Sequence, residues 1–344
     1  MSDKRITQQD VAKLAGVSRA AVSMAFKGDP GIPAETRERI RDIAAQIGYV
    51  PDPMLSALAA YRNRLRPSSF HGTLAWVVNS RGKFDWRKFP YFVDYFEGAQ
   101  VAARRHGFQL EVFDQAKRGM TSAKLAAIFR ARNIAGILLC PQPEAGTKIL
   151  DFPWQDFVAV TFGYTLKTPM LHTVASSHFN SAIECFNRLR ARGYKRIGFV
   201  LSQQHIERTK LHYLGGYLSA QTMSGMPEQL PPMIMQADAE PLRAWLDTYK
   251  PDAIVGGSYL PRFLKTLGYT LPGDLGVACP GLSSGTSELS GVWENSRHMG
   301  AVATDFLVSL LTHGERGVPA VQQTVLVEGV WIEGLTMESA RRTK

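Results

Sequence analysis

Side chains that hydrogen-bond to phosphate oxygens and base edges recur at helical spacing near the amino terminus. A step of about 100° per residue places one set on a single helical face, namely Arg19, Ala20, Ser23, Met24 and Lys27. Two further hydroxyl groups, on Thr7 and Ser18, stand where helices are expected to begin, and helix starts attract anions. Cationic and hydroxyl groups bind phosphates and base edges, whereas apolar groups contact thymine methyls. The pattern therefore predicts a surface for double-stranded DNA.

Three short helices are predicted to position these side chains. Thr7 with Asp10 indicates a capped first helix, Gly16 ends it, Ser18 caps the second helix and Pro33 begins the third. Their apolar faces are Val11, Leu14 and Ala15; Ala21, Val22, Ala25 and Phe26; and Ile40, Ile43, Ala44 and Ile47. Two helices joined by a tight turn under a third form a helix-turn-helix domain, whose second helix enters the major groove.

Four short motifs span this region. They are Asp10–Ser18 (Asp-Val-Ala-Lys-Leu-Ala-Gly-Val-Ser), Val22-Ser23, Thr36-Arg37 and Gly48–Pro51 (Gly-Tyr-Val-Pro). Together they resemble the LacI/GalR family of bacterial transcriptional regulators, which implies that residues 1–51 bind operator DNA. Ala20 and Met24 depart from the family, because relatives often carry polar or basic residues there. Neither side chain can make a bidentate hydrogen bond to a base, so direct reading falls to Arg19, Ser23 and apolar contacts.

Residues 52–70 have the sequence of a short helix followed by a basic linker. Asp52 can cap a helix with Pro53 at its first position, but so short a helix is unstable alone. In the family that the chain resembles, this segment folds only on DNA, where two copies pair and insert a leucine into the minor groove. The resemblance assigns that insertion to Leu58 and places Leu55 in the same DNA-binding segment. The alternative is that Leu58 packs against a second copy or against the large domain.

From residue 71 to residue 344, apolar strands alternate with amphipathic helices. The predicted strands include residues 73–78, 108–113, 136–140, 157–162, 196–200 and 253–255, and the predicted helices include 91–106, 122–132, 180–192, 211–223 and 299–311. This alternation is typical of parallel sheets covered on both faces, and the length suits two Rossmann-like lobes. The predicted fold class is α/β: an all-α helix-turn-helix domain, then a bilobed, periplasmic-binding-protein-like (type I) domain for effector binding and dimerisation.

Ligands of parallel sheets bind beyond the carboxyl ends of the strands, here in the cleft between the lobes. The candidates are Tyr91, Thr209, Tyr213, Ser258 and Glu294, with weaker ones at Trp86, Arg208 and Trp293. The resemblance covers this domain, but its sugar-holding positions have changed: Ser258-Tyr259 replaces Asn-Asp, Gly281 and Ser177 replace Asp, and Tyr213 replaces Arg. These changes argue against a standard hexose or pentose as the effector. Each aromatic candidate fills core as readily as it stacks on a ligand.

The composition fits a cytoplasmic protein with acidic partners. The net charge of +10 and pI near 9.6 favour nucleic acid, although the excess is spread along the chain. No stretch approaches the ~20 apolar residues that cross a bilayer, and the amino terminus lacks the apolar core of a signal peptide. Cys140, Cys185 and Cys279 are widely spaced, which predicts buried thiols. We expect no membrane association, no metal and no cofactor.

The combined prediction is a homodimeric repressor that binds operator DNA under the control of a small molecule, such as a sugar or sugar derivative. Two copies are expected because one recognition helix reads half a palindrome. Three alternatives remain: a cleft that is vestigial or binds a protein, an activator, and a serine hydrolase using Ser283 in Gly281–Gly285 (Gly-Leu-Ser-Ser-Gly). The hydrolase needs a downstream Asp and His. Asp305 lies on the predicted helix 299–311 and His313 lies at its end, which leaves no room for separate strand-end loops and argues against a hydrolase.

Overall fold

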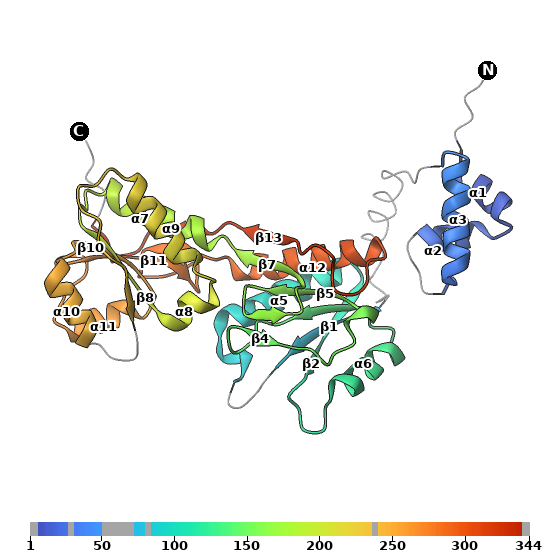
Figure 1. Cartoon of the computed structure of the whole chain (residues 1–344), viewed down its shortest axis with the longest axis horizontal. Coiled ribbons are helices and arrows are strands. Elements are labelled where there is room, and N and C mark those ends of the chain that lie inside the picture. Colours follow the sequence, from blue (N-terminus) through green and yellow to red (C-terminus); the bar gives the residue numbers. More distant parts are fainter. Residues whose placement is uncertain (1–5, 27–30, 50–71, 80–83, 236–239, 339–344) are drawn as a thin grey trace, which may run out of the picture.

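The computed structural model describes residues 6–26, 31–49, 72–79, 84–235 and 240–338 (Figure 1). These residues form a group of three helices and two lobes, each built on a six-stranded sheet. The predicted hinge over residues 52–70 lies outside the described residues, so the domain boundaries at 51 and 70 stay predictions.

The three amino-terminal helices pack around one small apolar core. Their bounds are α1 Gln8–Ala15, α2 Arg19–Phe26 and α3 Ala34–Gln46. The core consists of Val11, Ala12, Ala15, Val22, Ala25, Ile40 and Ala44. The predicted helices are confirmed, but Leu14 is wrong as a core residue, since it is 61% exposed. At about 100° per residue, Val11, Ala12 and Ala15 form one stripe and Leu14 falls to its side.

The first lobe is built on a sheet of parallel strands in the order β13-β7-β5-β3-β1-β2. The strands are β1 Gly72–Val78, β2 Phe108–Asp114, β3 Gly136–Leu139, β5 Val158–Phe162, β7 His172–Ser176 and β13 Thr324–Val327. The smaller elements are η1 Trp86–Lys88, β4 Thr147–Lys148, η2 Trp154–Asp156 and β6 Leu166–Thr168.

Helices cover both faces of this sheet, because alternate strand residues point to opposite sides. Leu74 and Trp76 pack with α5 Pro90–Arg105 and α12 Ser296–Thr312, whereas Ala75 packs with α6 Ser122–Ala131. The chain leaves this lobe at the carboxyl ends of β7 and β13.

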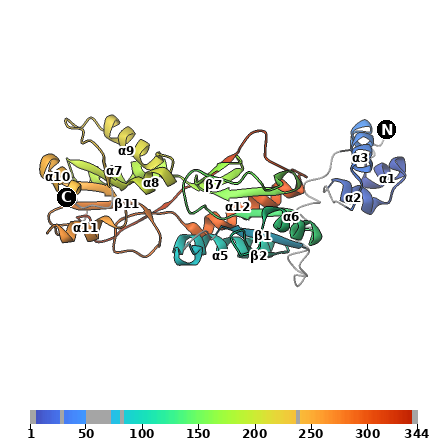
Figure 2. The ribbon, with the colours of Figure 1, turned by 60° about the horizontal axis from the view of Figure 1, so that its bottom comes forward.

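The second lobe repeats this arrangement with strands in the order β14-β12-β11-β10-β8-β9, of which β14 alone is antiparallel to its neighbour. The strands are β8 Ile197–Ser202, β9 Met233–Met235, β10 Ala253–Gly256, β11 Gly276–Leu282, β12 Gly291–Trp293 and β14 Val330–Ile332. The helices are α7 His178–Ala191, α8 Gln203–Arg208, α9 His212–Met223, α10 Glu240–Tyr249 and α11 Leu260–Thr266. Helices α7 and α9 cover one face, and α10 and α11 cover the other (Figure 2).

The chain passes between the lobes three times, from β7 to α7, from β12 to α12 and from β13 to β14. The first and third crossings are joined, since the amide of Ser177 donates to the carbonyl of Val327 (2.9 Å) and the side chain of Asn180 donates to Glu328 (2.9 Å). The predicted pair of Rossmann-like lobes is confirmed. The three crossings set where polar side chains from both lobes can meet.

Other sequence expectations can be compared with the described residues. The three cysteines are buried free thiols, as predicted. Within the described ranges, no helix is long and apolar enough to span a membrane, and no group of side chains has the composition of a metal site.

Candidate functional sites

Helix α2 presents the predicted DNA-reading side chains away from the small core. Arg19 and Ala20 are exposed and Ser23 and Met24 are half-buried, while the opposite face of α2 is buried against α1 and α3. The exposed face can therefore approach base edges without disturbing the helix packing. Three other predicted DNA contacts, Lys27, Leu55 and Leu58, lie outside the described residues and stay predictions.

The turn into α2 is fixed by two local features. Gly16 has a left-handed backbone with φ of 64°, and the hydroxyl of Ser18 accepts a hydrogen bond from the amide of Ala21 (3.1 Å). Because Ser18 accepts in this bond, its own proton is available for a phosphate. The hydroxyl of Thr7 instead donates to Asp10 (2.7 Å) in the predicted capping box. Of the two predicted phosphate-binding hydroxyls, Ser18 is the better placed.

At the lobe boundary, one carboxylate joins two crossings. Glu294 follows β12 on the second crossing, and His178 begins α7 on the first. Oε1 of Glu294 lies 3.2 Å from Nε2 of His178 and accepts a hydrogen bond of 2.7 Å from the hydroxyl of Tyr213 in α9. The rings of His178 and Tyr213 also meet edge to face, with centroids 4.7 Å apart. This network ties both crossings to the second lobe.

Burial and hydrogen bonding set the charges of this network. Burial raises the pKa of the Glu294 carboxyl, but the hydrogen bonds from His178 and Tyr213 and the charge of His178 outweigh it, so the pKa is lowered overall. Glu294 is therefore an anion at neutral pH. Burial and the adjacent Glu294 charge raise the pKa of Tyr213 well above its ordinary value, so its hydroxyl keeps the proton that it donates.

A guanidinium joins the lobes directly. Arg208 ends α8 in the second lobe, and its Nη1 donates to the carbonyl oxygens of Gln142 (3.0 Å) and Pro143 (2.8 Å), which follow β3 in the first lobe. It also hydrogen-bonds to the hydroxyl of Tyr91 at the start of α5. The side chain of Gln142 is fully buried and donates to the carbonyl of Cys140 (2.8 Å), which holds the acceptor loop in place. We refer to the residues of the network and of this bridge as the interlobe junction: Tyr91, Gln142, His178, Arg208, Tyr213 and Glu294.

The structure brings together three of the five predicted effector contacts. Tyr91, Tyr213 and Glu294 belong to the interlobe junction, although their contact with a ligand stays a prediction. Thr209 directly follows α8, and its hydroxyl donates to the carbonyl of His205 in that helix (2.8 Å). Ser258 lies exposed in the turn after β10.

Of the weaker sequence candidates, one belongs to the core and another to the interlobe junction. Trp86 is buried against Trp76, with ring centroids 6.0 Å apart, which makes it part of the core. Arg208 is instead central to the interlobe junction. His178 and Gln142 were missed, although both are polar residues just beyond the carboxyl end of a parallel strand. That position is the one signal by which the sequence could have found them.

Two family models match the chain. "Bacterial regulatory proteins, lacI family" matches residues 7–52. "Periplasmic binding proteins and sugar binding domain of LacI family" matches residues 82–257, which is just over half of the chain. The chain belongs to the LacI family. The resemblance inferred from the four amino-terminal motifs is thereby confirmed.

Known LacI-family proteins are similar over part of their length. The HTH-type transcriptional repressor CytR of Escherichia coli K12 is 27% identical over 225 residues, which are 64% of this chain and 60% of CytR. The HTH-type transcriptional regulator PtxS of Pseudomonas plecoglossicida is 32% identical over 136 residues, which are 39% of this chain and 36% of PtxS. The chain thus spans less than two thirds of the length of these relatives.

Solved LacI-family structures share the fold. A complex of the transcriptional regulator CelR with cellobiose has a TM-score of 0.57 at 22% identity, covering 96% of this chain and 100% of CelR. The lac repressor dimer bound to operator and the anti-inducer ONPF has a TM-score of 0.55 at 17% identity, covering 98% of this chain and 100% of that chain. Both likenesses concern the architecture of the helix-turn-helix and the two lobes.

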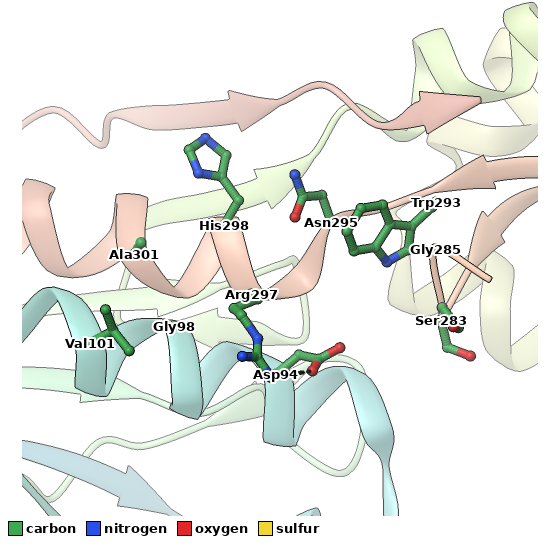
Figure 3. Close-up of a pocket in the computed structure, with 11 residues that line it drawn as sticks. Asp94, Gly98, Val101, Ser283, Gly285, Trp293, Asn295, Arg297, His298 and Ala301 are labelled. Atoms are coloured by element: carbon green, nitrogen blue, oxygen red, sulfur yellow. Dashed lines mark ion pairs between the residues drawn. The ribbon is translucent and has the colours of Figure 1, made fainter. Parts of the chain in front are cut away.

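This LacI-family chain also has a pocket of about 530 Å³ between α5, α12 and the loop after β11 (Figure 3). Arg297 of α12 reaches toward α5 there and pairs with Asp94 (3.9 Å) and with Glu97. The pocket is lined by Asp94, Gly98, Val101, Ser283, Ser284, Gly285, Trp293, Asn295, Arg297, His298 and Ala301.

The geometry around Ser283 does not support the hydrolase alternative. Ser283 lies in the loop between β11 and β12, whereas a nucleophile elbow needs a strand-to-helix turn. Asp305 is paired with Arg105 (2.7 Å), and His313 follows the end of the same helix, α12. His298 shares the pocket with Ser283 but points away from it (Figure 3). In the part of the chain that the structure describes, no hydrogen bond joins Ser283 to a histidine.

Proposed function

We propose that the chain is a dimeric transcriptional repressor whose affinity for operator DNA is controlled by a small molecule bound between its lobes. The observation that carries the proposal is the exposed face of α2 on a helix-turn-helix, followed by a two-lobed domain of the LacI family. CytR is named a repressor and CelR was solved with cellobiose, which supports the same activity here.

The DNA-binding step rests on α2. With its core face against α1 and α3, the helix offers Arg19 as a bidentate donor and Ser23 as a donor or acceptor to base edges. Ser18 and the amino end of α2 supply phosphate contacts that fix the register of the helix in the groove. One such helix reads half of a site, so two copies are needed for a palindrome.

The control step rests on the interlobe junction. The three crossings are the covalent connections between the lobes, so a change in the relative arrangement of the lobes must involve them. The contact between Glu294 and His178 joins two of these crossings. A molecule that binds the junction in one lobe arrangement better than in another shifts the population of that arrangement. If the arrangement sets how two amino-terminal domains approach DNA, the same molecule changes operator affinity.

Selection of genomic fragments tests the proposal. Sheared DNA of the source organism is bound to the purified full chain at two salt concentrations, and the retained fragments are sequenced. We expect a palindrome whose enrichment survives the higher salt, since phosphate contacts weaken with salt more than base contacts do. The Arg19→Ala variant should lose that enrichment. Equal retention of all sequences at both salts would contradict sequence-specific binding.

A further inference from the structure

Arg208 carries a positive charge that no carboxylate among the described residues pairs with. Its acceptors are the carbonyls of Gln142 and Pro143 and the hydroxyl of Tyr91, all of which are neutral. Across the described ranges, Arg208 forms no ion pair with a carboxylate. A half-buried cation is costly unless an anion is close, because the partly desolvated charge needs a counter-charge.

The titratable groups around Arg208 do not supply one. Burial raises the pKa of Tyr91, of Tyr95 and of the Cys140 thiol, so all three are uncharged at neutral pH. Burial and the charge of Arg208 lower the pKa of His205, which keeps that ring neutral as well. The guanidinium is therefore a fixed positive charge at the lobe boundary.

Glu294 forms no ion pair with Arg208, and the hydrogen bonds that it accepts from described residues come from other side chains. Both of its hydrogen-bond partners, His178 and Tyr213, are on Oε1. Oε2 receives no hydrogen bond from any described residue. The buried Nδ1 of His178 likewise has no hydrogen-bond partner among them. Among the described residues, the junction thus holds a guanidinium without an ion pair, a carboxylate oxygen without a donor and a ring nitrogen without a hydrogen-bond partner.

We propose that the ligand of the interlobe junction is a polyhydroxylated anion, whose carboxylate or phosphate binds Arg208 and whose hydroxyl groups hydrogen-bond to Oε2 of Glu294 and to Nδ1 of His178. This inference rests on the proposed function, since it names the class of its effector. The planar guanidinium keeps donors beyond Nη1, and its fork suits two-point binding of an anion. Because Arg208 already reaches the first lobe, an anion on it would strengthen the link between the lobes.

Matched compounds test the proposal on the full chain. Calorimetric titrations compare D-glucose with D-gluconate and D-glucose 6-phosphate, and D-ribose with D-ribonate and D-ribose 5-phosphate. Each set keeps the carbon chain and its hydroxyl configuration and compares no anion with a carboxylate on an open chain or a phosphate on a sugar that keeps its C1 aldehyde, so the set distinguishes the two sources of charge. We expect at least one anion to bind about tenfold or more tightly than its neutral parent, as charged hydrogen bonds allow.

Variants of Arg208 decide whether the preference arises there. Arg208→Met should abolish the preference and Arg208→Lys should keep part of it, while Arg243→Met, an exposed arginine on α10, should leave it unchanged. The proposal is overturned if a neutral sugar binds as tightly as its anions, if the preference survives Arg208→Met, or if none of the anions binds. Operator binding measured on the same preparation separates these failures from failure of the proposed DNA-binding function.

Discussion

The helix-turn-helix and the interlobe junction are built in opposite ways. In the first, each feature is local in sequence: Ser18 caps the helix that carries Arg19, and Gly16 makes the turn two residues earlier. In the second, one hydrogen-bonded network joins residues from α7, α9 and the segment after β12, which are far apart in the chain. Local sites can be recognised from motifs, whereas assembled sites depend on topology.

The comparison predicts that the local site depends most on one side chain. Arg19→Ala should weaken operator binding by about 10- to 100-fold, because a bidentate base contact contributes ~1–3 kcal/mol. Fluorescence anisotropy with the selected operator and a scrambled duplex measures this. Arg39→Ala on the exposed side of α3 is the matched control and should change both affinities little. Equal loss on both duplexes after Arg19→Ala would place Arg19 on phosphate rather than on bases.

Removing one member of the interlobe junction should lower the stability of the two-lobed domain. Tyr213→Phe deletes the 2.7 Å hydrogen bond to Glu294 and should lower the free energy of unfolding by ~1.5–3 kcal/mol, the range for bonds to charged groups. Urea unfolding of the two-lobed domain, followed by tryptophan fluorescence, measures the loss. An unchanged midpoint would mean that the bond contributes nothing to stability.

Gly281 offers an independent way to break the same bond. A Cβ at this position would lie 2.5 Å from the Tyr213 hydroxyl and 3.3 Å from Oε1 of Glu294, so Gly281→Ala must displace the tyrosine. We expect a loss of stability close to that of Tyr213→Phe. In the double variant the two losses should not add, because both act on one contact. Full additivity would show that Gly281 and Tyr213 act separately.

The local region should respond more weakly to loss of its cap. Ser18→Ala removes the acceptor for the amide of Ala21 and should destabilise the helix-turn-helix by about 1 kcal/mol. Ser18→Gly should destabilise it by only about a few tenths of a kcal/mol, since glycine is tolerated at the cap position. Thermal unfolding followed by circular dichroism compares the two variants. Equal destabilisation by both variants would contradict a stabilising role of the Ser18 hydroxyl as a helix cap.

The smallest effect expected is on the pH dependence of stability. The pKa of Glu294 is lowered in the folded chain, so its contribution is present above its unfolded pKa and is lost as pH falls below about 4.5. Other carboxyls, such as Asp305, share this direction, so the difference between wild type and Glu294→Gln isolates the contribution. Urea unfolding from pH 7 downward should show that difference shrinking in acid. A constant difference would contradict the assignment.

The same contrast explains what the sequence could predict. The helix ends, the buried faces of α2 and the alternation of strands and helices follow from spacing and caps, and they were predicted. Leu14 was misassigned because an amphipathic stripe on so short a helix has an uncertain centre. His178 and Gln142 were missed because their importance comes from where β7 and β3 end relative to the other lobe. Thr209 carries the right group, but its helix geometry turns the hydroxyl back on the main chain.

We propose that the interlobe junction controls the DNA-binding helices. The most direct test is the operator affinity of Arg208→Met, which removes the Arg208 hydrogen bonds between the lobes and leaves the residues of α2 unaltered. Coupling between sites of this kind changes affinity by about fivefold or more, so we predict a shift of at least that size in either direction. Arg243→Met should bind the operator like the wild type. An Arg208→Met variant that is folded and binds the operator with unchanged affinity would contradict the account.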